Sequence, residues 1–132
     1  MNKLLGVYGT LRKGHHNHYL LHGARHVDTI KTPPIFEMRS TGSFPILTPG
    51  EESVIMEVYE IVDPGSWRNI CQLEGYYGPE DPRNWYGMGQ FDKSKLKHIH
   101  YFYMSREAAQ GLPKVVGGDW HEYSHKRLTS HE

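Results

Sequence analysis

Residues 54–62, VIMEVYEIV, contain the feature that most constrains the fold, a strand pattern that changes at once into a helix pattern. The stretch alternates around β-branched and aromatic residues, which is typical of a β-strand. Asp63 then stands at an N-cap position and Pro64 at the first helical position, where its missing N–H costs nothing. Gly75 stands where a left-handed residue commonly ends a helix. We therefore predict a helix over residues 64–74.

The rest of the chain predicts more strands than helices. We expect strands at 3–9 and 98–104, extended chain at 26–38 interrupted by Pro33 and Pro34, helical turns at 15–24 and 105–113, and turn-rich segments at 40–53 and 76–91. Helical crossovers link few of these strands. This favours an α+β fold with a small, mixed, mostly antiparallel sheet that can curl into a barrel flanked by short helices. An all-β fold is the alternative.

Size, charge and cysteine content limit the class of protein. The 132 residues suffice for one domain with a substantial core, which we expect over residues 1–120, followed by a polar tail over 121–132. Fifteen basic and fifteen acidic residues balance, which argues against nucleic acid or an anionic membrane as a partner. The chain has no apolar run of the ~20 residues that a membrane helix needs and no signal-peptide pattern, so a cytoplasmic protein is expected. The lone Cys71 excludes an internal disulfide and a cysteine metal cluster.

Glu74 is the first candidate for chemistry, because it is predicted to lie in the last turn of the 64–74 helix. The helix macrodipole leaves partial negative charge at that end, so a carboxylate there costs about 0.3–1 kcal/mol and its pKa is expected to be raised. A raised pKa suits a carboxyl group to proton exchange near neutral pH. The alternative is an exposed surface glutamate beside a capping glycine.

The second candidate is VYGTLRKG, residues 7–14, where the chain leaves its first predicted strand. Gly9 permits backbone angles that are closed to other residues, so successive N–H groups can turn to one side and form an anion-binding nest. We expect Arg12 and Lys13 to be solvated, and neither a phosphate-loop nor a dinucleotide pattern is complete. An ordinary exit from a strand is the alternative.

The third candidate is HEYSH, in which His121, Glu122 and His125 match the H-E-x-x-H signature of zinc hydrolases. His131 stands where a longer form of the signature has a third ligand, but Leu128 replaces the glycine of that form. A match of this kind arises easily by chance in a chain with ten histidines. We therefore rank a zinc site below the other two candidates.

Another group of histidines lies near the N-terminus. Its members are His15, His16, His18, His22 and His26. No carboxylate or cysteine lies near them until Asp28, so we interpret the segment as a surface region whose histidines have partial charge near neutrality. Incidental binding of a divalent metal fits this segment better than a dedicated site.

Several segments, in this order along the chain, resemble the γ-glutamylcyclotransferase-like family, in particular its small AIG2-like or BtrG-like proteins. They are VYGTLRKG followed by Asn17, then GSFPIL, VIMEVYEI, CQLEGYY, YFYM and GGDW. The most specific pieces are Y-G-T-L-R-x-G after a first strand and L-E-G-Y after a helix. The resemblance implies a small mixed β-barrel flanked by helices.

The resemblance also implies roles for individual residues. The loop after the first strand would bind the α-carboxylate of a γ-glutamyl group through backbone N–H groups, which corresponds here to Tyr8, Gly9, Thr10 and Leu11. The catalytic glutamate of the family falls on Glu74, as general base and then general acid.

A substrate-binding tyrosine of the family falls on Tyr103, with Tyr101 as the alternative. The implied substrate is a small γ-glutamyl amine or γ-glutamyl amino acid, which is converted to 5-oxoproline and a free amine. The chemistry implies no metal and no cofactor, because the α-amine of the substrate is the nucleophile.

Two departures from the family pattern lie close to Glu74. The aspartate that often precedes the family glutamate is absent from residues 70–73, and residues 76–90 contain an insert that is expected to reshape the pocket for the leaving group. The alternatives are a non-catalytic binding module on the same fold and the zinc hydrolase. The sequence does not predict an oligomeric state.

Overall fold

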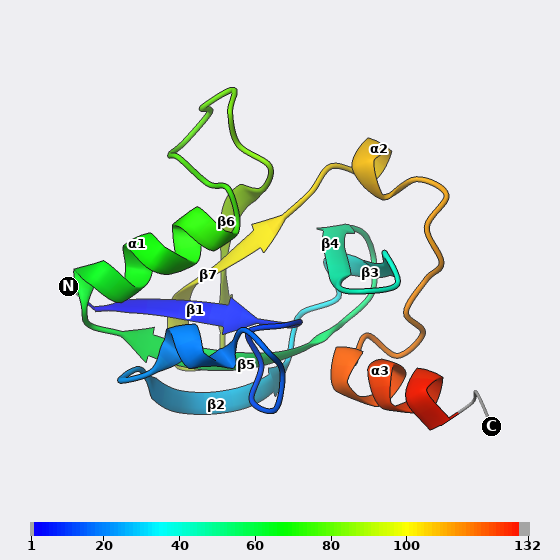
Figure 1. The fold of residues 1–132 in the computed structure, drawn as a ribbon, viewed down its shortest axis with the longest axis horizontal. Helices are drawn as coiled ribbons and strands as arrows, with labels where there is room; N and C mark the ends of the chain where they lie inside the picture. Colours follow the sequence, from blue (N-terminus) through cyan, green and yellow to red (C-terminus); the bar gives the residue numbers. More distant parts are fainter. Residues whose placement is uncertain (1, 130–132) are drawn as a thin grey trace.

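The structure is a computed structural model that describes residues 2–129, with side chains as far as residue 125. Its elements are β1 (Lys3–Val7), the 3-10 turn η1 (His18–Leu21), β2 (Arg25–Lys31), β3 (Phe36–Ser40), β4 (Pro45–Pro49), β5 (Ile55–Ile61), α1 (Pro64–Leu73), β6 (Gly87–Lys93), β7 (Leu96–Tyr103), α2 (Arg106–Ala109) and α3 (Trp120–Thr129). Figure 1 shows α1 beside the main sheet and the long α1–β6 loop projecting away from it. Within residues 2–129, no helix combines the length and the apolar character needed to cross a lipid bilayer.

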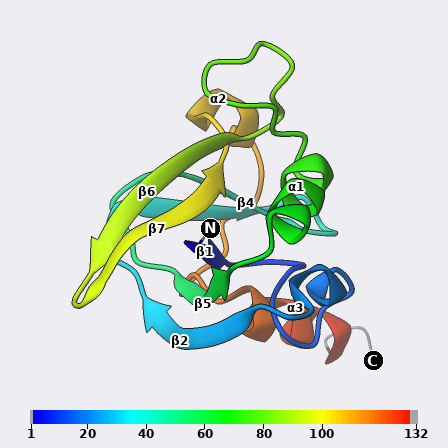
Figure 2. The same ribbon diagram turned by 90° about the vertical axis from the view of Figure 1, so that its left-hand side faces the viewer.

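Five strands form a single sheet in the order β2-β5-β1-β7-β6, and β3 and β4 form a separate pair. Strand β1 runs parallel to β7, with Leu4 opposite Ile99, whereas the other neighbours in the sheet are antiparallel. The main sheet is strongly twisted, with α1 and η1 on one side of it (Figure 2). The expected α+β class with a mixed, mostly antiparallel sheet is confirmed, and the strands form two sheets in place of a closed barrel.

Apolar side chains pack on both faces of the main sheet, as its alternating strands require. One face packs against α1 and η1 through Leu5, Val7, Leu21, Tyr59, Ile61, Ile70 and Phe102. The other face packs against β3, β4 and the start of α3 through Phe36, Met38, Leu47, Met56, Val58, Ile99 and Trp120. The sheet is thus a central layer with one apolar cluster on each of its faces.

The predicted helix over residues 64–74 is confirmed as α1, with Glu74 as its C-cap residue. The Asp63 carboxylate accepts a hydrogen bond from the Gly65 N–H at 3.0 Å, as an N-cap residue does. Gly75 adopts φ +62°, the left-handed conformation expected of the residue that ends a helix. The helix therefore ends at a defined place and presents Glu74 at its end.

Two strands lie where the sequence predicts turns, and both predictions are wrong. Strand β4 lies within 40–53 and β6 begins within 76–91. Prolines occupy both ends of β4, and glycines alternate in β6, so both segments read as turns. In the structure Gly87 and Gly89 pair with Tyr103 and Tyr101 of β7, whose rings lie over the space that side chains would need.

The polar C-terminal tail is helical from its start, because residues 120–129 form α3. Trp120 is 3% exposed and stacks on Tyr123, with ring centroids 5.4 Å apart. The predicted domain boundary at residue 120 therefore falls at the first residue of a helix that is anchored in the core.

Candidate active site

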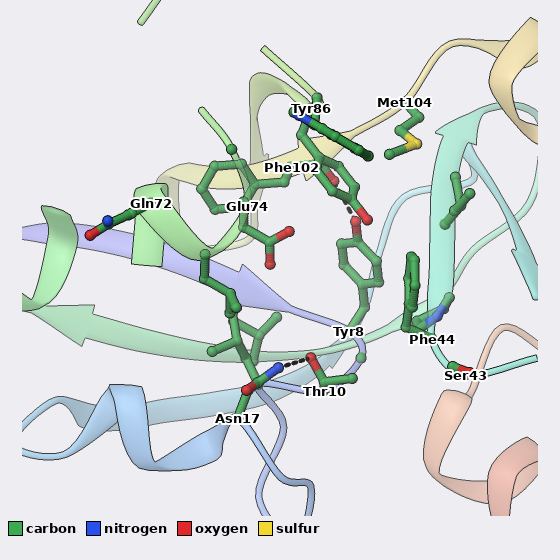
Figure 3. A pocket seen from close by; sticks show the side chains of 18 of the residues that line it. Tyr8, Thr10, Asn17, Ser43, Phe44, Gln72, Glu74, Tyr86, Phe102 and Met104 are labelled. Carbon is green, nitrogen blue, oxygen red and sulfur yellow. Dashed lines mark hydrogen bonds between the residues drawn. The ribbon is translucent and has the colours of Figure 1, made fainter. Parts of the chain in front are cut away.

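A cavity of about 610 Å³ opens where the loop after β1, the segment before β4 and the end of α1 meet (Figure 3). Its volume is in the range of sites for small molecules. Tyr8, Gly9, Thr10 and Leu11 line it together with Glu74. The fold therefore brings together two segments that are more than sixty residues apart in the sequence, the two that the resemblance singled out.

The Glu74 carboxyl group extends from the end of α1 into this cavity (Figure 3). Burial in the cavity raises the pKa of Glu74 from 4.5 to about 7, because desolvation disfavours the charged form. The sequence also predicts a raised pKa for Glu74, but it attributes the rise to the helix dipole and not to burial. At neutral pH this carboxyl group exists in both protonation states, as a group that accepts and returns a proton requires.

The loop after β1 is shaped by close contacts rather than by unusual backbone angles at Gly9. Gly9 has no positive φ, so the prediction that a glycine is needed here for its unusual backbone angles is wrong. A Cβ at this position would stand 2.7 Å from Cγ of Pro45, and the glycine is needed because the loop passes directly against β4.

Side chains hold the loop in a closed turn. The Asn17 side chain donates to Thr10 Oγ1 at 2.9 Å, and the Asn17 N–H donates to the Thr10 carbonyl at 3.0 Å. Among the described residues, no hydrogen bond has the backbone N–H of Thr10 or Leu11 as its donor. These two N–H groups therefore have no acceptor among the described residues, and both residues line the cavity.

Arg12 does not point into solvent as the sequence predicts, whereas Lys13 is exposed. The Arg12 guanidinium is buried and donates to Glu57 at 2.9 Å and to Asp119 at 2.8 Å. Glu57 also accepts the Lys13 N–H at 2.9 Å and the Tyr59 hydroxyl at 2.9 Å. This group of residues ties the loop to β5 and to the start of α3.

Burial alone would raise the pKa of Glu57, but hydrogen bonds from the Lys13 N–H, Arg12 and Tyr59 hold it below its usual value. Glu57 is therefore ionised, as the buried guanidinium beside it requires. The stretch VIMEVYEIV contains two glutamates, and Glu57 is the one that shares a face of the strand with Tyr59 and Ile61, which could have indicated an inward-facing charge.

Tyr103 and its alternative Tyr101 are not among the described residues that line the cavity. Side chains alternate along β7, so Phe102 faces the cavity and the two tyrosines face β6 and Phe36. Tyr86 lines the cavity instead, just before β6. Burial and then the nearby charge of Glu74 raise the pKa of Tyr86, so its hydroxyl remains protonated. The sequence did not single out Tyr86, since it lies inside the predicted turn-rich segment.

The H-E-x-x-H residues lie on α3, and none of them is among the described residues lining the cavity. His121 Nδ1 lies 3.3 Å from His15 Nε2, and the rings of His121 and His125 lie 4.6 Å apart. Across the described residues, no group of three or more His, Cys, Asp or Glu side chains is arranged to hold a metal ion. His131 lies outside the described residues. The geometry therefore offers the zinc hydrolase hypothesis no support.

Comparison with known proteins agrees with this fold and indicates a family. Residues 5–122 match the family described as "Gamma-glutamyl cyclotransferase, AIG2-like". A Vibrio cholerae serotype O1 protein named "Putative gamma-glutamylcyclotransferase" is 39% identical over 74 residues, which are 56% of this chain and 64% of that protein. The match thus spans a little less than two thirds of that relative.

Solved structures show the same fold. An uncharacterized protein from Pyrococcus horikoshii has a TM-score of 0.74 and 21% identity, covering 98% of this chain and 99% of its own. An AIG2-like protein from Mus musculus has a TM-score of 0.66 and 21% identity, covering 89% of this chain and 88% of its own. The family match extends over most of the chain, and the chain therefore belongs to the gamma-glutamyl cyclotransferase, AIG2-like family.

Proposed function

We propose that this protein is a γ-glutamyl cyclotransferase that converts a γ-glutamyl amine or γ-glutamyl amino acid into 5-oxoproline and a free amine. The observation that carries the proposal is the Glu74 carboxyl group, with a pKa of about 7, in the same cavity as the loop of residues 8–11. Family membership supports cyclotransferase activity in general, and the cavity supports the assignment of Glu74.

The reaction is an intramolecular exchange of one amide bond for another. The substrate α-amine attacks the γ-carbonyl carbon, a C–N bond forms in a five-membered ring, and the C–N bond to the leaving amine breaks. Glu74 accepts the proton that the attacking nitrogen loses and delivers it to the leaving nitrogen. No water is consumed, and the main task of the protein is to hold the substrate in a folded conformation.

The loop after β1 holds the other end of the substrate in this proposal. The N–H groups of Thr10 and Leu11 bind the α-carboxylate, which directs the neighbouring α-amine toward Glu74. The neutral Tyr86 hydroxyl, rather than that of Tyr103, is assigned to the γ-glutamyl group. Tyr8 supports the wall, since its hydroxyl donates to the Phe102 carbonyl at 2.6 Å.

The test is release of 5-oxoproline from a panel of γ-glutamyl amides and dipeptides. Glu74→Gln keeps the shape of the side chain but removes the proton acceptor, so kcat is expected to fall by about 10²–10⁴-fold. Glu122→Gln on α3 is the matched control and is expected to retain activity, because Glu122 lies outside the cavity.

Three results would change the assignment. Full activity in Glu74→Gln would remove Glu74 from the mechanism. Loss of activity in Glu122→Gln, together with stoichiometric zinc, would favour a hydrolase. Binding of γ-glutamyl compounds with no 5-oxoproline from any of them would identify a binding module instead of an enzyme.

A further inference from the structure

The outer part of the cavity is lined by large aromatic side chains that are exposed to solvent. Tyr77 and Trp85, both from the insert after α1, are 57% and 76% exposed, and Phe44 before β4 is 40% exposed. Exposed aromatic residues that gather at one cavity indicate a surface for an apolar group. We call Phe44, Tyr77 and Trp85 the aromatic rim.

The insert is held in place by hydrogen bonds of its own. The Tyr77 N–H donates to the Asn84 side chain at 2.6 Å, and that side chain donates to the Gly78 carbonyl at 2.7 Å. The Trp85 N–H donates to the Gly75 carbonyl at 2.9 Å. Hydrogen bonds of the backbone and of the Asn84 side chain therefore position the two aromatic residues of the insert at the cavity, directly beyond the end of α1.

The described lining of the cavity offers no lysine or arginine that could bind a second carboxylate. None of the described residues that line it is a lysine or an arginine, and His16 is the single lining histidine among them. His16 belongs to the segment between β1 and η1, not to the insert or to the segment before β4 that carry the aromatic rim. The only acidic lining residue in the described chain is Glu74, which would repel an anionic leaving group.

Arg83 contacts the aromatic rim through Tyr77, and it is already paired with Asp81. Its guanidinium stacks on Tyr77, 4.2 Å from the ring centroid, and donates to Asp81 at 2.8 Å and 3.0 Å. The pair leaves no net charge beside the rim, and Arg83 is not among the described residues that line the cavity. A carboxylate on the leaving group would therefore lie near Glu74 with no lysine or arginine in the described lining, and repulsion from Glu74 would disfavour it.

We propose that the leaving group is an apolar aralkyl amine without a carboxylate, rather than an α-amino acid. This inference rests on the proposed cyclotransferase function and adds the chemical class of the released amine. The α-carboxylate of the γ-glutamyl group lies on the loop after β1, Glu74 lies at the scissile amide, and the aralkyl group packs on the aromatic rim.

A matched pair of substrates tests the charge requirement. γ-Glutamyl-phenethylamine and γ-glutamyl-L-phenylalanine differ only in the carboxylate of the leaving group. We expect kcat/KM for the amine to be higher by about 10-fold, because the carboxylate of the amino acid would lie near Glu74 without a lysine or arginine in the described lining. Equal values, or a preference for the amino acid, would overturn the inference while 5-oxoproline release still supports the cyclotransferase.

Variants of the aromatic rim test the apolar contact. Trp85→Ala is expected to raise KM for γ-glutamyl-phenethylamine by about 5–10-fold, the effect of losing one aromatic contact, and to leave KM for γ-glutamyl-methylamine unchanged. An equal effect on both substrates would contradict contact between the rim and the leaving group.

A gain-of-function variant tests the missing cation directly. Met104 lines the cavity, and Met104→Lys is expected to shift the ratio of kcat/KM values toward γ-glutamyl-L-phenylalanine by about 10-fold. Val62→Lys, at a position that is 52% exposed and outside the cavity, is the control and should leave the ratio unchanged. A similar shift in both variants, or none in Met104→Lys, would overturn the proposal.

A binding measurement distinguishes failure of the proposed cyclotransferase function from failure of the proposed preference for an apolar amine. N-Glutaryl-phenethylamine and N-glutaryl-L-phenylalanine lack the α-amine and cannot cyclise, so calorimetry compares their affinities without turnover. Tighter binding of the amine in a protein that releases no 5-oxoproline would refute the enzyme and support the preference of the cavity. Equal binding would refute the preference as well.

Discussion

At the scale of single residues, Glu74 is a carboxyl group in surroundings that disfavour its ionised form. It stands at the C-terminal end of α1 and half-buried in a cavity, and both features disfavour a negative charge. Burial is the cause that accounts for its raised pKa. Local rules are commonly violated where function requires it, and Glu74 fits that description.

We expect the activity of the enzyme to depend on the ionisation of Glu74. A general base must be deprotonated to accept a proton, so kcat/KM should fall tenfold per pH unit below a pKa of about 7. A rate profile from pH 5 to 9 with γ-glutamyl-phenethylamine measures this acid limb. The limb should be absent from the residual activity of Glu74→Gln, and a limb near pH 4.5 in the native enzyme would contradict the raised pKa.

The same residue is expected to reduce stability at neutral pH. Because its pKa rises from 4.5 to about 7 on folding, the folded state binds the proton more tightly and the free energy of unfolding falls as pH rises between these values. Glu74→Gln should therefore stabilise the protein at pH 8 by about 2 kcal/mol, allowing for partial exposure, but little at pH 4. Urea denaturation at both pH values measures this, with Glu122→Gln as the control.

At the scale of elements, the loop after β1 is attached to two other parts of the fold through one buried guanidinium. Arg12 joins the loop to Glu57 of β5 and to Asp119 before α3, and Asn17 closes the turn. These contacts determine where the N–H groups of the loop point. Arg12 is thus a positioning residue that acts through the backbone, not a ligand for the substrate.

Removal of Arg12 should destabilise the loop and weaken substrate binding. Arg12→Met leaves Glu57 buried without its cation, so we expect a loss of about 3 kcal/mol in the free energy of unfolding and a higher KM. Arg12→Met combined with Glu57→Gln should recover part of the stability. Arg25→Met is the matched control, since Arg25 is largely exposed in its ion pair with Glu60 and should cost less than about 1 kcal/mol. Similar losses from both single arginine variants would contradict the role of burial.

The elements that the sequence predicts well are those whose local pattern agrees with their tertiary surroundings. The helix α1 and strand β5 have such patterns, and Glu74 follows from the end of α1. Strands β4 and β6 do not, because their prolines and glycines are explained only by partners elsewhere in the chain. Gly89 is compatible with a strand since Tyr101 covers it, and Gly9 is required since Pro45 lies against it.

The same limit applies to the site. The pairing of Glu74 with residues 8–11 follows from a family resemblance, whereas Tyr86 and Arg12 depend on the positions of β6 and β5. The family resemblance assigns a substrate-binding tyrosine to β7 but does not indicate which face of the strand meets the cavity. Phe102 occupies that face, and the register that decides this is set by pairing with β1 and β6.

At the scale of the whole molecule, the main sheet is stabilised by packing on both faces, and α3 belongs to one of them. Trp120→Ala is expected to reduce the free energy of unfolding by about 3–5 kcal/mol, because the ring is buried in the apolar cluster between the main sheet and the β3–β4 pair. Trp85→Ala removes the same side chain at a position that is 76% exposed and should cost less than about 1 kcal/mol. Chemical denaturation of both variants makes the comparison, and equal losses would contradict the role of α3 in the core.

The parallel pairing of β1 with β7 has a consequence for how the protein is made. Leu4 and Leu5 align with Ile99 and His100, so the strand that leads into the substrate loop acquires one of its two neighbours only after most of the chain has been synthesised. Contacts so distant in sequence also slow folding, since a long loop must close first. During translation the first twenty residues emerge early, but the sheet that supports them is complete only after β7 has been synthesised and has paired with β1.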